Sequence, residues 1–299
     1  MAKPSLTIAI PFHQGLEYLK AAVESVLAQE DPEWTLLVCD DGGSEREELR
    51  AFLEALQDAR IHYHEHPESG GMVGNWNRQF ELAQTELLTL LHQDDQLLPN
   101  YVGLVRALGE EQPSISAFFT AARIIGPDGG PRFSFADWIK RFLQPRAQGE
   151  LRLAGKSALE ALLRGNFIMC PTLSFRIAAL EGLRFDPRWQ QVQDLDLLCR
   201  LLLQGHELLG SPQEAYAYRR HAAAATSLQS ESLLRFEEES ALLSELAELC
   251  AARNWQHAAR IARSKRIVKL NLIYCSLADC LRLRWGAARR KLGFLRRMG

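Results

Sequence analysis

The chain has 299 residues, of which 47% are hydrophobic and 24% are charged. This composition excludes a disordered, a collagen-like or a disulfide-dominated protein, and the length suits one large domain with an appendage or two ordinary domains. The net charge of -2 conceals a division: residues 1–252 carry 22 basic and 36 acidic side chains, whereas residues 253–299 carry 13 basic side chains and one acidic one, Asp279. An acidic body with a basic tail indicates an anionic partner, either a membrane or a nucleic acid.

The first hundred residues alternate apolar runs with helical patterns. Unbroken apolar runs predict buried strands at 6–10, 35–39, 61–64 and 87–91. Apolar positions at helical spacing predict helices at 16–29, 45–56 and 75–83. Strand–helix alternation predicts an α/β fold with a mostly parallel sheet flanked by helices, and unalternated apolar strands indicate that both faces are covered.

The rest of the chain is less regular at first. Glycine and proline breakers predict a loop over 126–149, regular patterning resumes at 151, and a helix is predicted over 194–203. Long helical patterns then run from about 230 to the end. Six cysteines without metal-ligand spacing predict reduced thiols, and the opening residues do not resemble a signal peptide, so we expect a cytoplasmic chain.

Two acidic pairs directly follow predicted strands: Asp40 with Asp41, and Asp94 with Asp95. Ligands of open parallel sheets bind at the carboxyl ends of the strands, so we expect the two pairs to meet in one crevice. Adjacent carboxylates repel, and a cation or a hydrogen-bonding ligand between them would relieve that repulsion. Mg²⁺ or Mn²⁺ with a nucleoside diphosphate suits such ligands. The alternative is that each pair only makes a turn and caps a helix.

Three other polar groups each allow two interpretations. Asp194 opens a helix, where it either caps the first turn or serves as a general base. His62, His64 and His66 share one face of a strand, which suits either a metal or an exposed polar strand. The segment from Arg219 to His221 either pairs with a diphosphate or forms a solvated turn.

The motifs in their order resemble glycosyltransferase family 2. The opening LTIAIPFHQGLEYLKAAVESVLAQ and the following WTLLVCDDGG look like the start of that family. GGMVGNWNRQFELAQTELLTLLHQDDQLLPNY is similar to its central segment with the metal-binding DXD motif. NFIMCPTLSFR, FDPRW, QDLDLLCRLLLQG and YAYRRH resemble the acceptor-side half. The resemblance covers about residues 5–227.

The resemblance implies a GT-A fold and inverting transfer of a sugar from a nucleotide-sugar, with a UDP- or dTDP-sugar favoured, to a glycan or lipid-linked acceptor. It implies a glycosyltransferase domain over 1–227, with a nucleotide-binding half at 1–100 and an acceptor-binding half at 101–227. The helical pattern of the remaining residues, outside the resemblance, predicts a helical extension at 228–299. The implied site residues are Pro11, Asp40, Asp41, Asn77, Arg78 and Asp95 for the donor, Asp94 and His221 for Mg²⁺ or Mn²⁺, and Asp194 as catalytic base. Independently of the resemblance, we expect Arg219 and Arg220 to neutralise charge on the diphosphate, because arginine pairs with phosphate oxygens.

Two positions depart from the family pattern. His92 occupies the first DXD position, and Gln193 replaces the glutamate of a Glu-Asp pair. An alternative is therefore a catalytically degenerate subunit that binds the donor or a partner.

The basic tail carries apolar residues at three- and four-residue steps from Leu270 to Leu295, which predicts one long amphipathic helix or a pair of helices. Such a stretch is typical of a peripheral membrane contact with anionic lipid, and packing on the body or on a second subunit is the alternative. A nucleic-acid-binding protein is disfavoured because no recognised module of that kind is present.

Overall fold

The computed structural model describes residues 3–66, 68–134, 142–221 and 233–298. Its strands are β1 (Leu6–Phe12), β2 (Thr35–Asp40), β3 (Ile61–Glu65), β4 (Leu87–Leu90), β5 (Gln96–Leu97), β6 (Ala117–Ile125), β7 (Leu151–Ala154), β8 (Leu173–Arg176) and β9 (Glu207–Arg219). Its α-helices are α1 (Leu16–Leu27), α2 (Arg46–Ala55), α3 (Gly71–Leu82), α4 (Tyr101–Glu111), α6 (Gly155–Arg164), α7 (Gln193–Leu203), α9 (Leu234–Ala252), α10 (Gln256–Ser264), α11 (Arg266–Leu281) and α12 (Trp285–Arg297). Short 3₁₀ turns, η1 (Cys170–Thr172) and η2 (Ile177–Leu180), flank β8.

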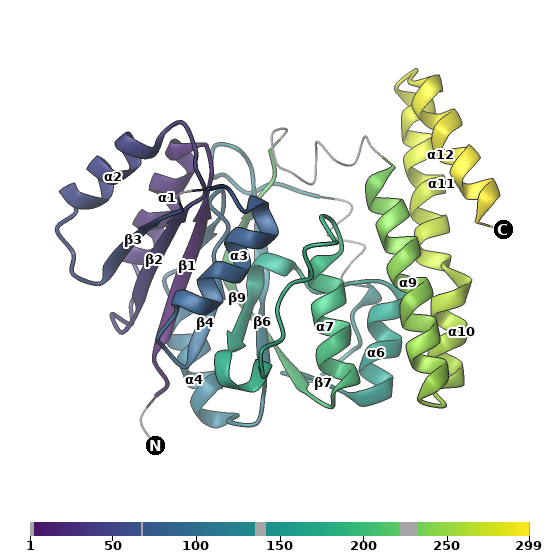
Figure 1. Cartoon of the computed structure of the whole chain (residues 1–299), viewed down its shortest axis with the longest axis horizontal. Coiled ribbons are helices and arrows are strands. Elements are labelled where there is room, and N and C mark those ends of the chain that lie inside the picture. The colour runs from purple at the N-terminus through teal and green to yellow at the C-terminus, as the bar shows by residue number, and fades with distance from the viewer. Residues whose placement is uncertain (1–2, 67, 135–141, 222–232, 299) are drawn as a thin grey trace.

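The strands form one mixed sheet with the order β3-β2-β1-β4-β8-β6-β9-β5, and β7 pairs with β9 (Figure 1). β1 is parallel to β2 and to β4, and β3 continues the parallel set beside β2. β8 runs antiparallel between β4 and β6, whereas β6 and β9 are parallel. The loops that follow β1, β2 and β4 therefore leave the sheet at the same edge.

Both faces of the sheet are buried, because side chains alternate between two separate cores. Along β1, Ile8 and Ile10 belong to the core under α1, α2 and α4, whereas Ala9 belongs to the other core. That second core is covered by α3, α6, α7 and the C-terminal helices. This arrangement explains why the strands read as unbroken apolar runs.

The strands and helices predicted for the first hundred residues are present, and the expected α/β class is confirmed. One helix starts earlier than predicted: α3 begins at Gly71, not at residue 75. Gly71 has a φ of +67°, a left-handed conformation that glycine adopts without a steric penalty, so it can lead the chain into the helix. Residues 135–141 of the predicted loop, and the predicted domain boundary at 227–228, lie outside the described residues.

The tail forms separate helices that stack beside the body. α9, α10 and α11 contribute buried residues to the same core as α6 and α7, and α12 folds back along α11 (Figure 1). The expectation of one amphipathic helix or a pair is thereby resolved as the pair α11 and α12. In the part of the chain that the structure describes, no helix combines the length and the apolar character needed to cross a bilayer.

Candidate active site

The loops after β1, β2 and β4 meet at the carboxyl edge of the parallel strands. Gln93, in the loop after β4, accepts a hydrogen bond from the backbone N–H of His13 at 3.2 Å and donates one to the carbonyl of Gln14. The loop after β1 and the loop after β4 are therefore held together by direct hydrogen bonds. This edge is where open parallel sheets bind their ligands.

Asp40 ends β2 and is fully buried. One carboxylate oxygen accepts hydrogen bonds from the amides of Gly42 (3.0 Å) and Gly43 (3.2 Å), and the other accepts from Arg46 Nε (2.8 Å) and the Tyr63 hydroxyl (2.9 Å). Burial raises the pKa of Asp40, but these hydrogen bonds outweigh it, so the pKa lies below its ordinary value. The carboxylate is held ionised by its own surroundings.

The turn around Asp40 requires glycine. A Cβ on Gly43 would lie 1.7 Å from the carbonyl oxygen of His13, and Gly42 has a φ of +87°. The backbone can therefore wrap both amides around the carboxylate only without side chains. This close approach gives the Asp-Asp-Gly-Gly sequence a local structural reason.

Asp41 holds the loop that leads into α3. Its carboxylate accepts hydrogen bonds from Ser69 Oγ at 2.7 Å and from the Gly70 amide at 2.8 Å. Among the described residues, the grouped candidate metal ligands are His92 and the second acidic pair, and the group does not include Asp40 or Asp41. The predicted contacts of Asp40 and Asp41 with a donor remain a proposal.

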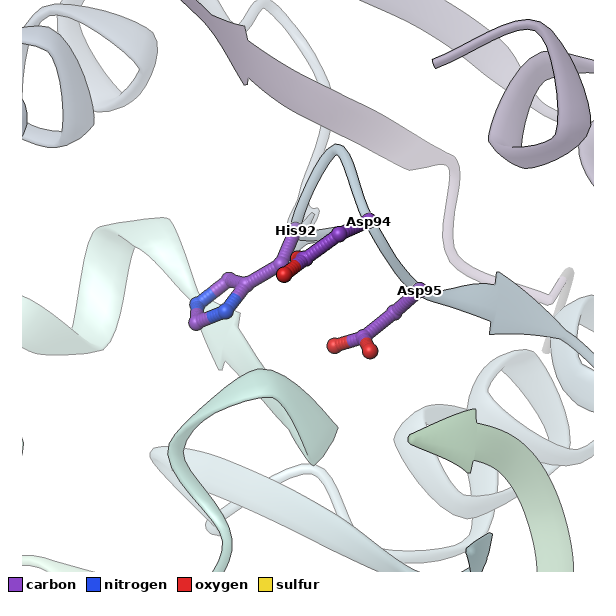
Figure 2. Close-up of side chains that lie close together, drawn as sticks. All are labelled: His92, Asp94 and Asp95. Atoms are coloured by element: carbon purple, nitrogen blue, oxygen red, sulfur yellow. The ribbon is translucent and has the colours of Figure 1, made fainter. Parts of the chain in front are cut away.

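His92, Asp94 and Asp95 project from the turn between β4 and β5 (Figure 2). One ligand atom of each lies within 4.8 Å of the other two, which suits a shared metal ion. A neutral imidazole with two carboxylates is a ligand set that Mn²⁺ accepts, and Mg²⁺ accepts the carboxylates. His92 was a departure from the family pattern in the sequence, and here it completes the cluster.

Two features of this cluster fit a bound cation. His92 Nε2 is buried and has no hydrogen-bond partner, and burial lowers the pKa of His92, which favours the neutral form that ligates metals. Burial and the charge of Asp94 raise the pKa of Asp95 well above its ordinary value. A cation among the three side chains would relieve the repulsion between the carboxylates.

The end of β9 brackets the cluster from the other half of the chain. The Tyr216 hydroxyl and the Arg219 amide donate to Asp95 at 3.0 and 2.7 Å. His221 Nε2 lies 2.9 Å from an oxygen of Asp94, and its ring stacks near Tyr18 of α1, with centroids 4.9 Å apart. The structure thus brings Asp94 and His221 together, as their predicted role as a pair of metal ligands requires.

Arg219 and Arg220 differ in their surroundings. The buried Arg219 guanidinium donates to the carbonyls of Asp94 (2.7 Å), Gly126 (3.1 Å) and Pro127 (3.0 Å). These bonds hold the loop after β4 to the loop after β6, a structural role for Arg219 that the sequence does not predict. Arg220 lies over the ring of Tyr218, 4.7 Å from its centroid.

The predicted donor residues on α3 and β1 also have defined places. The Asn77 side chain donates to the Phe185 carbonyl (2.8 Å) and accepts from the Phe185 amide (2.9 Å). Asn77 therefore links α3 to the segment before α7. Arg78 is exposed and pairs with Glu81 at 2.7 Å, and Pro11 lies half-buried beside Cys39 of β2.

Asp194 lies in the first turn of α7, on the acceptor-side half of the chain. Its carboxylate accepts a hydrogen bond from Asn166 Nδ2 at 2.9 Å, and the side chain is partly accessible. The adjacent Gln193 is buried with its Oε1 atom unpartnered. A half-exposed carboxylate at a helix start is compatible with both capping and proton transfer.

Sequence reasoning missed several residues of this site. Asn75 is buried and donates to the Cys39 carbonyl at 3.1 Å, between the ends of β1 and β2. Tyr216 donates to Asp95 and Tyr18 lies beside the ring of His221, and both come from elements distant in sequence from the cluster. Of these, only Asn75 carries a local signal, because a buried-facing amide in an apolar helix needs a partner.

Comparisons with known proteins extend these observations. The sequence profile "Glycosyl transferase family 2" matches residues 7–175. An uncharacterised protein of Mycobacterium tuberculosis is 28% identical over 231 residues, covering 75% of this chain and 69% of that protein. The putative colanic acid biosynthesis glycosyl transferase WcaA of Escherichia coli is 30% identical, covering 35% and 37%, and the putative teichuronic acid biosynthesis glycosyltransferase TuaG of Bacillus subtilis is 27% identical, covering 44% and 52%.

Solved structures share the fold at low identity. Staphylococcus aureus TarS in complex with UDP-GlcNAc has a TM-score of 0.61 at 15% identity, over 81% of this chain and 66% of that one. The mannosyltransferase PcManGT of Pyrobaculum calidifontis, in complex with GDP-Man and Mn²⁺, has a TM-score of 0.58 at 13% identity, over 99% and 84%. These similarities confirm the predicted GT-A type of sheet and its flanking helices.

Proposed function

Because the chain belongs to glycosyl transferase family 2, we propose that it transfers a sugar from a nucleoside-diphosphate sugar to an acceptor hydroxyl, with inversion at the anomeric carbon. The observation that carries this proposal is the cluster of His92, Asp94 and Asp95 at the carboxyl edge of the sheet. That edge is where the diphosphate of a donor would lie.

The donor side is built from the loops after β1, β2 and β4. The nucleoside would lie near Pro11, Asp40 and Asp41, with Asn77, Arg78 and Asp95 beside it, and its diphosphate near Arg220. A UDP- or dTDP-sugar is the favoured donor. His92, Asp94 and His221 would hold Mg²⁺ or Mn²⁺, which when bound supplies positive charge for the leaving diphosphate.

The chain's own residues supply the rest of the chemistry. Asp194 of α7 is the proposed base, which takes the proton from the acceptor hydroxyl. The oxygen of that hydroxyl at the same time bonds to the anomeric carbon of the sugar. The bond from that carbon to the diphosphate breaks as the new one forms. Asn77 positions the segment before α7 through Phe185.

The acceptor is proposed as a glycan or a lipid-linked glycan in the synthesis of a cell-surface polysaccharide. This proposal is supported by two relatives whose names assign them to colanic acid and teichuronic acid biosynthesis. A chain that is peripheral to the inner face of a membrane suits such an acceptor.

The first experiment is a thermal-shift screen of UDP-, dTDP- and GDP-sugars with and without Mn²⁺. A true donor raises the melting temperature in proportion to the logarithm of its concentration over its dissociation constant, and it does so more strongly with Mn²⁺. The donor so found is then used for donor hydrolysis and transfer assays, and the product anomer is read by NMR.

Asp194→Asn is expected to reduce transfer by at least about 10²-fold, because general base catalysis typically contributes 10²–10⁴-fold. Donor affinity, measured by calorimetry, is expected to stay nearly unchanged. Asp58→Asn is the matched control, since that carboxylate pairs with Arg60 in a distant surface turn. Equal loss of transfer and donor binding in Asp194→Asn contradicts the base assignment, and donor binding by the wild type without any turnover favours a degenerate binding subunit.

A further inference from the structure

The last two helices present an apolar face whose large side chains are exposed. We call residues 266–297, which form α11, α12 and the turn between them, the C-terminal hairpin. One face of α11 packs into the core through Val268 and Leu272. The opposite face is exposed, and its apolar residues recur at three- and four-residue steps, so they form one continuous stripe. The stripe consists of Leu270, Ile273, Tyr274, Leu277 and Leu281.

The stripe continues into the turn of the hairpin. Leu281, Leu283 and Trp285 are 87%, 74% and 62% exposed. The exposed Arg282 and Arg284 alternate with them along the chain. Large apolar side chains at an accessible tip, interleaved with arginines, are typical of a segment that enters the boundary between lipid headgroups and acyl chains.

The charge of the hairpin is one-sided. It contains nine basic side chains and one acidic side chain, Asp279. Asp279 is buried and pairs with Lys291 at 2.5 Å, with both side chains less than a tenth exposed. The hairpin therefore has a net charge of +8, and six exposed arginines place positive charge beside the apolar stripe: Arg282, Arg284, Arg289, Arg290, Arg296 and Arg297.

We propose that the C-terminal hairpin binds the surface of a membrane rich in anionic lipid, with its tip inserted among the headgroups. Such a surface offers both things that the hairpin complements, negative charge and an apolar layer beneath it. A nucleic acid offers the charge without the apolar layer. A second copy of the hairpin would bring a net charge of +8 against another +8.

The hairpin tip also faces the same way as the candidate active site. In Figure 1, β1 starts near the N-terminus at the bottom and runs upward, and the turn between α11 and α12 lies at the top. If the proposed function holds, an acceptor anchored in lipid would approach the carboxyl edge of the sheet from the membrane. The binding of the hairpin to lipid does not depend on that function.

The test is vesicle flotation of the whole chain, without donor or acceptor. We expect strong binding to vesicles with about equal parts of phosphatidylcholine and phosphatidylglycerol, weak binding to phosphatidylcholine alone, and a loss of binding as salt is raised. The tip variant Leu281→Ser/Leu283→Asn/Trp285→Ser and the charge variant Arg282→Glu/Arg284→Glu should each lower binding about tenfold or more. These side chains are exposed, so both variants should fold, which circular dichroism and melting check.

Two matched controls separate the tip from general effects. Leu249→Ser removes an exposed leucine from α9, and Arg253→Glu/Arg260→Glu reverses two exposed arginines outside the hairpin. Both should bind vesicles within about twofold of the wild type. The proposal is overturned if the wild type binds both vesicle types equally, or if the controls lose binding as much as the tip variants. It is also overturned if the wild type does not bind vesicles and the tip variant instead dissociates a dimer, measured by light scattering. The same holds if the wild type does not bind vesicles and the tip variant abolishes DNA binding.

Discussion

At the scale of single residues, both acidic pairs are held by hydrogen bonds, and they differ in the side chains that lie beside them. Asp40 and Asp41 are occupied by hydrogen bonds from their own loops and from Ser69. Asp94 and Asp95 are also hydrogen-bonded, to residues at the end of β9, but they lie beside His92 in one group of candidate metal ligands. The Asp-Asp motif is the same in both places, and the surroundings decide its use.

His92 is expected to contribute directly to cation binding. Removing one of a few ligands from a small site weakens the complex, so His92→Ala should lower the affinity for Mn²⁺ about tenfold or more. Calorimetric titration with MnCl₂ alone measures this. His62→Ala, which removes an exposed imidazole from β3, should leave the affinity unchanged. An unchanged affinity in His92→Ala would place the cation elsewhere.

Tyr63 is expected to stabilise the protein only while Asp40 is ionised. Because the pKa of Asp40 is lowered on folding, its stabilisation is present above the ordinary carboxyl pKa of about 4 and is lost as the pH falls through the folded-state value. Tyr63→Phe removes one hydrogen bond to the carboxylate and should cost about 1–2 kcal/mol at pH 7. That difference should shrink in acid.

Denaturant unfolding from pH 3 to pH 7 measures the Tyr63 effect, with Asp40→Asn and the double variant completing the cycle. The two changes should couple at pH 7, because they share one hydrogen bond. A Tyr63→Phe cost that stays constant across this pH range would mean that the hydroxyl stabilises the fold by another route.

At the scale of elements, α3 connects the two halves of the domain. Its Trp76 packs against His92 on one side and Phe185 on the other, with ring centroids 5.2 and 5.1 Å apart. Asn77 adds a paired hydrogen bond to the Phe185 backbone. α3 therefore contacts both His92 of the candidate metal cluster and the segment that leads to Asp194, and these contacts hold the two parts in a fixed arrangement.

Asn77→Ala is expected to destabilise the fold by about 1–3 kcal/mol, because it leaves the Phe185 amide and carbonyl without partners. If the Phe185 segment positions Asp194, kcat should fall more than the donor KM rises. Denaturant unfolding and steady-state kinetics measure the two effects. Glu81→Gln on the same helix breaks only a surface pair and should change stability by less than about 0.5 kcal/mol. A rise in donor KM with kcat unchanged would contradict the positioning of Asp194 through Asn77 and leave only its proposed place beside the donor.

At the scale of the whole molecule, the C-terminal helices share a core with the body. Leu246 of α9 and Val268 of α11 belong to the same buried cluster as Phe175 of β8 and Leu198 of α7. The helical extension should therefore unfold together with the sheet, although the basic tail has a composition of its own.

Leu246→Ala is expected to lower the free energy of unfolding by about 2–5 kcal/mol, since the side chain is fully buried. Unfolding should remain a single transition when α-helical circular dichroism and tryptophan fluorescence are compared. Leu249→Ala, on the exposed side of the same helix, should cost less than about 1 kcal/mol. Two separate transitions in the wild type would show that the extension folds independently.

The residue pattern is sufficient to predict the strand–helix alternation, the buried strands and the acidic residues at their ends. Each of these depends on neighbours within a few positions, because burial recurs with the period of the helix or strand. The charge division between body and tail can likewise be read from the order of residues, since it requires no partner.

Only the tertiary structure decides which polar groups are already engaged. The partners of Asp95 and Arg219 lie more than 90 residues away along the chain, and Asn77 meets Phe185 across 108 positions. A local pattern carries no information about such distances. The fold engages Arg219 in hydrogen bonds between two loops, places His92 beside Asp94 and Asp95, and buries Asp279 against Lys291. These contacts could not be predicted from the sequence, because hydrogen bonding and desolvation depend on which residues the topology brings together.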